Sequence, residues 1–182
     1  MPFRDESLDV VIMFEAIYYF LRADRVLGEC RRVLRYNGFV VERAESSLYF
    51  LEQELSQDGR AVKIIPVVGD IMDRWKVEEV FQQYIPEIVY HAAAYKHVPL
   101  MEAHPLVAIE NNVFGTEIVA QAARGAGVRR FVLVSTDKAV RSVGIMGMTK
   151  RVAECLVLAL EGARCSSSTW ARRSASRIWP RT

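Results

Sequence analysis

The segment Ser135-Thr136-Asp137-Lys138 contains the residue types in this sequence that are best suited to chemistry. A hydroxyl, a carboxylate and an ammonium group follow directly on an apolar run. Groups so close together shift one another's pKa values and can serve proton transfer. A polar helix cap with a surface ion pair is the alternative interpretation. The first is favoured, because parallel α/β sheets bind ligands at the carboxyl ends of their strands.

Lys150 opens the next predicted helix, and Met146 stands four positions before it. A Tyr-x-x-x-Lys pair marks the short-chain dehydrogenases and reductases. There the lysine holds the nicotinamide ribose and lowers the pKa of the tyrosine. Since Met146 occupies the tyrosine position here, the usual phenolic base is absent.

Two earlier apolar runs also end in residues that suit a nucleotide. Ala92-Ala93-Ala94 follows His91, and consecutive alanines let a ribose and a pyrophosphate approach the backbone. Taken alone, the run is better explained as helix-forming alanines with no ligand. Asp70 follows Gly69 and could accept a hydrogen bond from an adenine amine, although Gly-Asp is also a common turn.

Apolar runs and amphipathic segments alternate along the chain, which predicts a Rossmann-like, doubly wound parallel sheet with helices on both faces. We expect four or five strands, with 64–68, 88–90 and 131–134 at the centre. The predicted strands are 8–14, 39–41, 62–68, 88–91 and 130–135. The predicted helices are 21–35, 46–55, 73–84, 105–125 (broken near Asn111-Asn112) and 149–160.

Composition excludes several classes of function. The chain has 182 residues, of which 51% are hydrophobic and 25% charged, and its net charge is only +2. This gives no argument for binding nucleic acid or an acidic membrane surface. We expect no signal peptide and no membrane span, and therefore a cytoplasmic protein. The three cysteines lack metal-ligand spacing, so no metal site is expected.

Residues 42–160 resemble a known family, the CapD-like polysaccharide biosynthesis proteins. These are nucleotide-sugar 4,6-dehydratases acting on UDP-N-acetylhexosamines, within the extended short-chain dehydrogenase/reductase group. The resemblance is carried by ERAESSLYFLEQEL (42–55), VVGDIMDR (67–74), VYHAAAYKHVPLMEAHPL (89–106), ENNVFGT (110–116) and VLVSTDKAV with MGMTKRVAE (132–154).

The resemblance implies a reaction and a catalytic group. NAD (or NADP) would take a hydride from sugar carbon 4, water would leave across carbons 5 and 6, and the hydride would return to carbon 6. Thr136, Asp137 and Lys138 would handle the proton transfers. Met146 would line the site, and Lys150 would hold the nicotinamide ribose.

It also implies binding residues for cofactor and substrate. Glu42 or Arg43 would contact the adenosine ribose. The adenine would lie against Asp70 and Ile71, and the cofactor backbone against Ala92, Ala93 and Ala94. Near the substrate or the active-site helix would be Lys96, His97 and Asn112, although His97 could equally be a solvated loop residue. A homo-oligomer is one possible assembly.

The two ends of the chain differ from this family. Residues 1–41 resemble the later half of a class I SAM-dependent methyltransferase and are expected to supply a strand and a helix. Residues 163–182 are expected to be a disordered basic tail, for which a frameshifted or artificial end is favoured over a functional arm. We therefore expect an incomplete Rossmann portion at 42–162, with impaired activity. A methyltransferase remnant and a non-catalytic nucleotide-binding module remain the alternatives.

Overall fold

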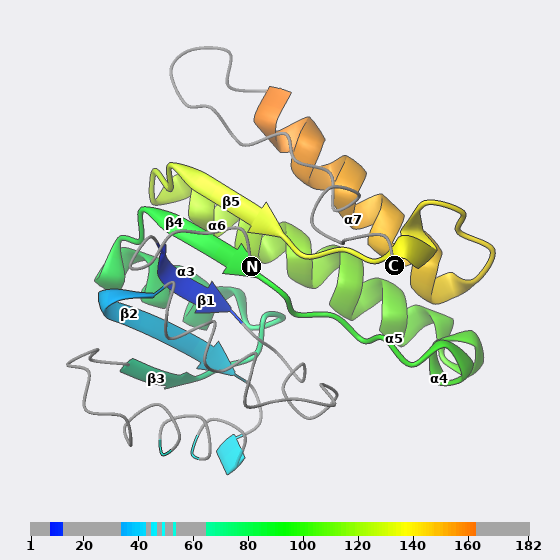
Figure 1. The fold of residues 1–182 in the computed structure, drawn as a ribbon, viewed down its shortest axis with the longest axis horizontal. Coiled ribbons are helices and arrows are strands. Elements are labelled where there is room, and N and C mark those ends of the chain that lie inside the picture. The colour runs from blue at the N-terminus through cyan, green and yellow to red at the C-terminus, as the bar shows by residue number, and fades with distance from the viewer. Residues whose placement is uncertain are drawn as a thin grey trace, which may run out of the picture.

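The computed structural model describes residues 8–12, 34–42 and 65–162, together with positions 45, 46, 49 and 53. Its centre is a five-stranded sheet of order β3-β2-β1-β4-β5, in which every neighbouring pair is parallel (Figure 1). This confirms the predicted fold class. The strands are β1 (Leu8–Ile12), β2 (Leu34–Glu42), β3 (Ile65–Val68), β4 (Ile88–His91) and β5 (Arg130–Leu133).

The predicted centre of the sheet is wrong. β1 is the middle strand, while β3 and β5 form the two edges of the sheet that the structure describes. The prediction rested on the alternation of strands and helices and on the buried apolar runs, neither of which fixes the order of the strands. The order is set instead by the crossover after β3, which returns the chain to the far side of β1 and places β4 there.

The start of β2 also differs from the prediction. A helix was expected to reach residue 35 and to stop at Asn37-Gly38, but the strand begins at Leu34 and contains that pair. The register explains this: β1 advances from Leu8 to Val10 while β2 advances from Leu34 to Phe39. The strand therefore accommodates the Asn-Gly pair in an irregularity of the bulge type. The rest of the 21–35 prediction lies outside the described residues, and positions 46, 49 and 53 of the 46–55 prediction are helical.

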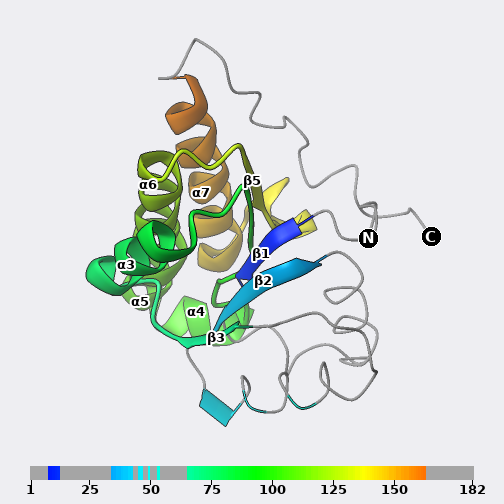
Figure 2. The same cartoon turned by 90° about the vertical axis from the view of Figure 1, so that its left-hand side faces the viewer.

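Helices cover one face of the sheet, where α3, α6 and α7 lie side by side (Figure 2). The predicted long helix is a rod of three parts, whose middle part is a π-helix at the place where the Asn-Asn pair predicted a break. The helical elements are α3 (Arg74–Tyr84), α4 (Val98–Ala103), α5 (Pro105–Ile109), the π-helix η2 (Glu110–Gly115), α6 (Thr116–Gly125), the 3-10 turn η3 (Asp137–Ala139) and α7 (Ile145–Gly162).

Packing against this face forms the main core. Phe81 of α3, Val89 of β4 and Val119 of α6 are almost completely buried there. α3 is held at its start by Asp73, whose carboxylate accepts a hydrogen bond from the backbone amide of Lys76, as expected for an N-cap. Burial and capping thus fix α3 on this face of the sheet, beside α6.

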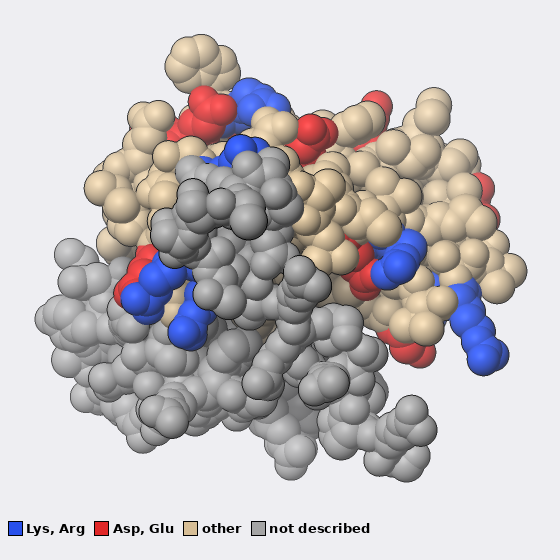
Figure 3. Space-filling view, turned by 90° about the horizontal axis from the view of Figure 1, so that it is seen from above, with Lys and Arg blue, Asp and Glu red and all other residues tan. Residues whose placement is uncertain are grey.

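On the face shown in Figure 3, the described residues carry interspersed charges of both signs. No helix in the described ranges is both long and apolar enough to span a membrane. No group of three or more potential metal ligands occurs among those residues either.

Candidate active site

Asn112 lies at the centre of a buried hydrogen-bonded network. Its side-chain oxygen accepts from the Tyr95 backbone amide at 2.7 Å and from the Asn111 side chain at 3.1 Å. Its amide nitrogen donates to the Tyr95 carbonyl and to Thr149 Oγ1, both at 3.0 Å. The side chain joins the segment after β4, the π-helix and α7. Asn112 was predicted near the substrate or the active-site helix; its position is in that helix, fully buried and bonded on both side-chain atoms to protein groups.

The π-helix has a local cause. Thr116 Oγ1 donates to the carbonyl of Asn112 at 2.8 Å, a bond from a side chain to the residue four positions earlier. A hydroxyl in that position competes with the ordinary backbone bond and distorts a helix. Gly115 stands beside it, and a Cβ at that position would lie 2.4 Å from Cδ1 of Ile71. The π-helix therefore packs directly on the turn that follows β3.

Lys150 is buried beside the end of β5. Its side-chain ammonium donates to the carbonyl of Val134 at 2.7 Å, and the residue is only 6% exposed. Burial lowers the pKa of Lys150 to about 8, and the nearby Glu154 carboxylate opposes the shift. The residue lies in the second turn of α7 rather than at its start, because the helix begins at Ile145.

Met146 fills the position of the missing tyrosine with an apolar side chain. It is 3% exposed and packs with Met101 and Ala108, which belong to α4 and α5. A thioether suits such an irregular apolar gap. The side chain therefore adds no titratable group to this end of α7.

Thr136 precedes the turn η3, in which Asp137 and Lys138 are exposed. Asp137 Oδ1 accepts from Thr136 Oγ1 and from the Lys138 backbone amide, both at 3.0 Å. Thr136 is the N-cap, so the cap in the alternative interpretation is present. The Asp137 carboxylate and the Lys138 ammonium remain at the surface, where a substrate could reach them.

Two residues that the sequence analysis did not single out hold this turn and α7 in place. A Cβ on Gly147 would lie 2.5 Å from the carbonyl oxygen of Lys138, so only glycine lets η3 rest on the first turn of α7. Glu102 Oε1 accepts from the amide of Ile145 at 2.7 Å and caps α7 from α4. The Glu102 cap joins residues 43 positions apart, so no local pattern could have revealed it, and the Gly147 contact depends on how η3 folds back on α7.

The predicted cofactor residues follow the ends of several strands. Ala92, Ala93 and Ala94 form an irregular segment after β4, so the interpretation as helix-forming alanines is wrong. Asp70 accepts a hydrogen bond from the Met72 amide in the turn after β3. Glu42 is the last residue of β2, and Arg43 lies outside the described residues. Because the strands are parallel, these positions all lie at the end of the sheet where the carboxyl ends of the strands meet.

The remaining predicted residues divide into buried core residues and exposed residues before α4. Ile71 is 1% exposed and belongs to the main core, where Ala93 also lies. Lys96 and His97 are exposed just before α4. Partial burial lowers the pKa of Lys96. This pair therefore lies at the surface.

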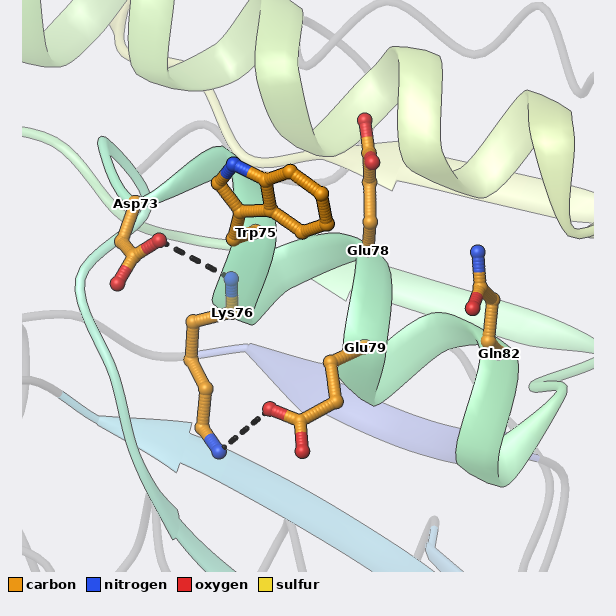
Figure 4. Close-up of a pocket in the computed structure, with 6 residues that line it drawn as sticks. All are labelled: Asp73, Trp75, Lys76, Glu78, Glu79 and Gln82. Carbon is orange, nitrogen blue, oxygen red and sulfur yellow. Dashed lines mark hydrogen bonds and ion pairs between the residues drawn. The ribbon is translucent and has the colours of Figure 1, made fainter.

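A surface pocket along α3 is a less suitable site (Figure 4). Its lining comes from one helix and its cap, and Lys76 already pairs with Glu79 at 2.8 Å. Active sites draw convergent groups from several elements. The carboxyl ends of β4 and β5 bring together groups from several elements, whereas the α3 pocket is lined by one helix and its cap.

The parallel 3-2-1-4-5 sheet and the buried Lys150 define a Rossmann-like protein of the short-chain dehydrogenase/reductase type. The family model described as "Polysaccharide biosynthesis protein" matches residues 29–175, and the chain belongs to this family. A methyltransferase domain model matches residues 1–41. The resemblance to the CapD-like proteins is thereby confirmed.

Sequence identity to individual relatives supports the same family assignment. The chain is 42% identical over 135 residues to the capsular polysaccharide biosynthesis protein CapD of Staphylococcus aureus, covering 72% of this chain and 22% of that protein. It is 39% identical over 135 residues to the probable polysaccharide biosynthesis protein EpsC of Bacillus subtilis (strain 168), covering 72% and 23%. The chain thus spans less than a quarter of the length of these relatives.

Solved structures share the fold. Pen from Bacillus thuringiensis superposes with a TM-score of 0.73 at 27% identity, over 92% of this chain and 48% of that one. The UDP-Glc/GlcNAc 4-epimerase of Campylobacter jejuni superposes with a TM-score of 0.71 at 16% identity, over 85% and 50%. The similarity thus extends over about half of each of these proteins.

Proposed function

We propose that this chain carries the cofactor-binding half of a nucleotide-sugar 4,6-dehydratase that acts on a UDP-N-acetylhexosamine. The observation that carries the proposal is the placement of η3 on the first turn of α7, beside the buried Lys150. In that arrangement the Thr136 hydroxyl, the Asp137 carboxylate and two ammonium groups follow the carboxyl end of β5. The ammonium groups belong to Lys138 and Lys150. It supplies proton-transfer groups without a tyrosine.

The residues present fit a nicotinamide dinucleotide. The irregular alanine segment after β4 lets a nucleotide approach the backbone, and Asp70 follows β3 at the same edge. When bound, the cofactor would accept a hydride from sugar carbon 4 and return it to carbon 6. Lys150 would hold the nicotinamide ribose, with Ala92, Ala93 and Ala94 against the cofactor backbone.

The chain's own groups would move the protons. Thr136 and Asp137 would take the proton from the hydroxyl on carbon 4 as the ketone forms, and would pass a proton to the carbon 6 hydroxyl so that it leaves as water. The ketone acidifies the hydrogen on carbon 5, which the Asp137 carboxylate or the Lys138 amine would remove as a proton; a proton would return to carbon 5 when the hydride returns to carbon 6, and the ketone at carbon 4 remains in the product. The substrate would lie between this turn and the exposed pair Lys96 and His97.

Cofactor binding is expected to be weak in this chain. Residues 13–20, which follow β1, contain no glycine. In this fold the pyrophosphate binds to backbone amides of a glycine-rich turn at a helix N-terminus. Loss of several such hydrogen bonds weakens affinity by a few orders of magnitude, at about 1.4 kcal/mol per tenfold. We therefore propose that turnover is impaired.

Calorimetric titration of the purified chain with NAD tests the cofactor assignment. Lys150→Met should weaken NAD binding at least about tenfold, whereas Arg151→Met, at the exposed neighbouring position, should not. Equal affinities of the two variants would remove Lys150 from the cofactor site. Micromolar binding by the unaltered chain would instead overturn the expectation of a weak site.

Mass spectrometry after incubation with NAD and UDP-N-acetylglucosamine tests the reaction. A 4,6-dehydratase converts the sugar to a product lighter by one water. A 4-epimerase, the second candidate because UDP-glucose 4-epimerases of Rickettsia species are also relatives, leaves the mass unchanged. A parallel titration with S-adenosylmethionine covers the methyltransferase alternative, which the match to residues 1–41 supports.

A further inference from the structure

His91 is a buried histidine to which the proposed mechanism gives no role. It is the last residue of β4 and is 0% exposed. Its ring lies 5.9 Å from that of Phe131, centroid to centroid, and its Nε2 lies 3.1 Å from Thr116 Oγ1. The imidazole thus connects the end of the central sheet to the start of α6.

The hydrogen bonds around Thr116 define which ring nitrogen carries the proton. The Thr116 hydroxyl has one proton, and it donates this proton to the Asn112 carbonyl at 2.8 Å. Thr116 can therefore only accept from His91, which requires a proton on Nε2. His91 Nδ1 is then a bare acceptor, and it has no hydrogen-bond partner among the described residues.

The charge state agrees with this geometry. Burial, and secondarily the charge on Lys150, lower the pKa of His91 to about 3. The ring is therefore neutral at physiological pH, and one tautomer is selected by its partner.

We propose that His91 is a positioning residue: its Nε2–H fixes the Thr116 hydroxyl, and thereby the π-helix that holds Asn112 between Tyr95 and Thr149. Thr149 precedes Lys150 in α7, so the chain of bonds runs from β4 to the helix that carries the ribose-binding lysine. The effect on cofactor binding rests on the proposed function. The hydrogen-bonding arrangement itself does not.

Nitrogen-15 NMR of the imidazole rings tests the first step directly. The sequence contains only three histidines, and the other two, His97 and His104, are exposed on either side of α4. A His91→Gln variant assigns the signals. We expect His91 to be neutral with its proton on Nε2, both at pH 7 and at pH 5. A proton on Nδ1, or an imidazolium at pH 5, would overturn the proposal.

A matched pair of variants tests the second step. Thr116→Ser keeps the hydroxyl, whereas Thr116→Val replaces it with a methyl group of the same shape. We expect Thr116→Val to mix the two tautomers of His91 and to speed hydrogen exchange at the Tyr95 amide roughly tenfold or more, with Thr116→Ser close to the unaltered chain. Unchanged tautomer signals and exchange in Thr116→Val would show that His91 and the π-helix are independent.

Titration with NAD separates this inference from the proposed function. If NAD binds, Thr116→Val should weaken it several-fold and Thr116→Ser should restore it, because a displaced α7 misplaces Lys150. Equal NAD affinity in both variants would overturn the link to the cofactor site. If NAD does not bind at all, the proposed function fails, while the tautomer and exchange results still decide the role of His91.

Discussion

The Asn112 network and the η3 turn both lie near the carboxyl ends of the strands, but they differ in burial and in hydrogen bonding. Asn112 is fully buried, and both its side-chain oxygen and its side-chain nitrogen make two hydrogen bonds to protein groups. Asp137 and Lys138 are exposed, and the Asp137 carboxylate accepts hydrogen bonds from Thr136 and from the Lys138 amide, its neighbours in the chain.

The difference separates positioning from chemistry. A fully satisfied buried network has one low-energy arrangement, because breaking any bond leaves an unpaired polar group away from water. An exposed turn contributes little to stability, and under the proposed function its carboxylate and ammonium groups would be accessible to a substrate. Gly147 joins the two regions, since it lets the turn rest on α7. Substitutions in the Asn112 network should therefore mainly reduce stability, and substitutions in the η3 turn should mainly reduce activity.

The largest expected change in unfolding free energy is the one caused by lowering the pH, through protonation of His91 in the unfolded chain. Its pKa is about 3 in the folded chain and near 6.5 in the unfolded chain. Between these values the unfolded state binds more protons, so the stabilising contribution is complete above pH 6.5 and is lost as the pH falls toward 3. The full loss is roughly 4–5 kcal/mol, at about 1.4 kcal/mol per pH unit.

Urea unfolding at a series of pH values from 7 to 4 measures this loss. The His91→Gln variant lacks the titrating ring and should show a shallower fall in unfolding free energy than the unaltered chain. The carboxylates are common to both proteins and cancel in the difference. Parallel curves would show that His91 can accept a proton without unfolding.

Removing the side-chain amide of Asn112 should have the next largest effect. Asn112→Leu removes the hydrogen bonds that the side chain makes to the backbone amide and carbonyl of Tyr95 and to Thr149 Oγ1. The expected loss in unfolding free energy is about 3 kcal/mol. Asn111→Ala is the control, because it removes a single hydrogen bond to the same network and should cost about 1 kcal/mol. Similar losses in the two variants would mean that Asn112 is not the centre of the network.

Gly147→Ala should break the contact between the two regions. The added Cβ would meet the Lys138 carbonyl oxygen at 2.5 Å, so the turn must move away from α7. We expect a loss of roughly 1–3 kcal/mol in unfolding free energy, as for overpacking elsewhere. In Gly125→Ala nothing lies within 4 Å of the added atom, and stability should be unchanged or slightly higher. A neutral Gly147→Ala would show that the turn is not held against the helix.

The features that the sequence predicted correctly depend on local signals. The parallel α/β class followed from alternating apolar runs and amphipathic segments. β4 was predicted at its observed bounds, and α3 to within one residue, its predicted first residue Asp73 being the N-cap. The break in the long helix was predicted at the Asn111-Asn112 pair, which lies inside the π-helix.

The features that it missed depend on contacts between distant residues. The order of the strands could not follow from their apolar character, because β1 became central only through the crossover that placed β4 beside it. The cap that Glu102 provides for α7 joins distant segments, and the packing of Gly147 on Lys138 depends on how the turn folds back on the helix. The roles of Thr136, Asp137 and Lys138 came from the resemblance and stay a prediction.

The smallest effect on stability is expected at the reactive turn, and it is the change that should matter most for activity. Asp137→Asn keeps an oxygen that can accept from Thr136 and from the Lys138 amide, so the turn should keep its shape. The unfolding free energy should change by no more than about 0.5 kcal/mol, as for most exposed positions. In a competent full-length relative built on this segment, loss of the carboxylate should nevertheless abolish formation of the 4-keto sugar while leaving NAD bound. Asp73→Asn is the matched control, because asparagine caps α3 as well as aspartate and lies away from η3. Turnover by Asp137→Asn at the unaltered rate would remove Asp137 from the mechanism, and a loss of stability beyond 1 kcal/mol would show that the turn, like the Asn112 network, depends on its charge for structure.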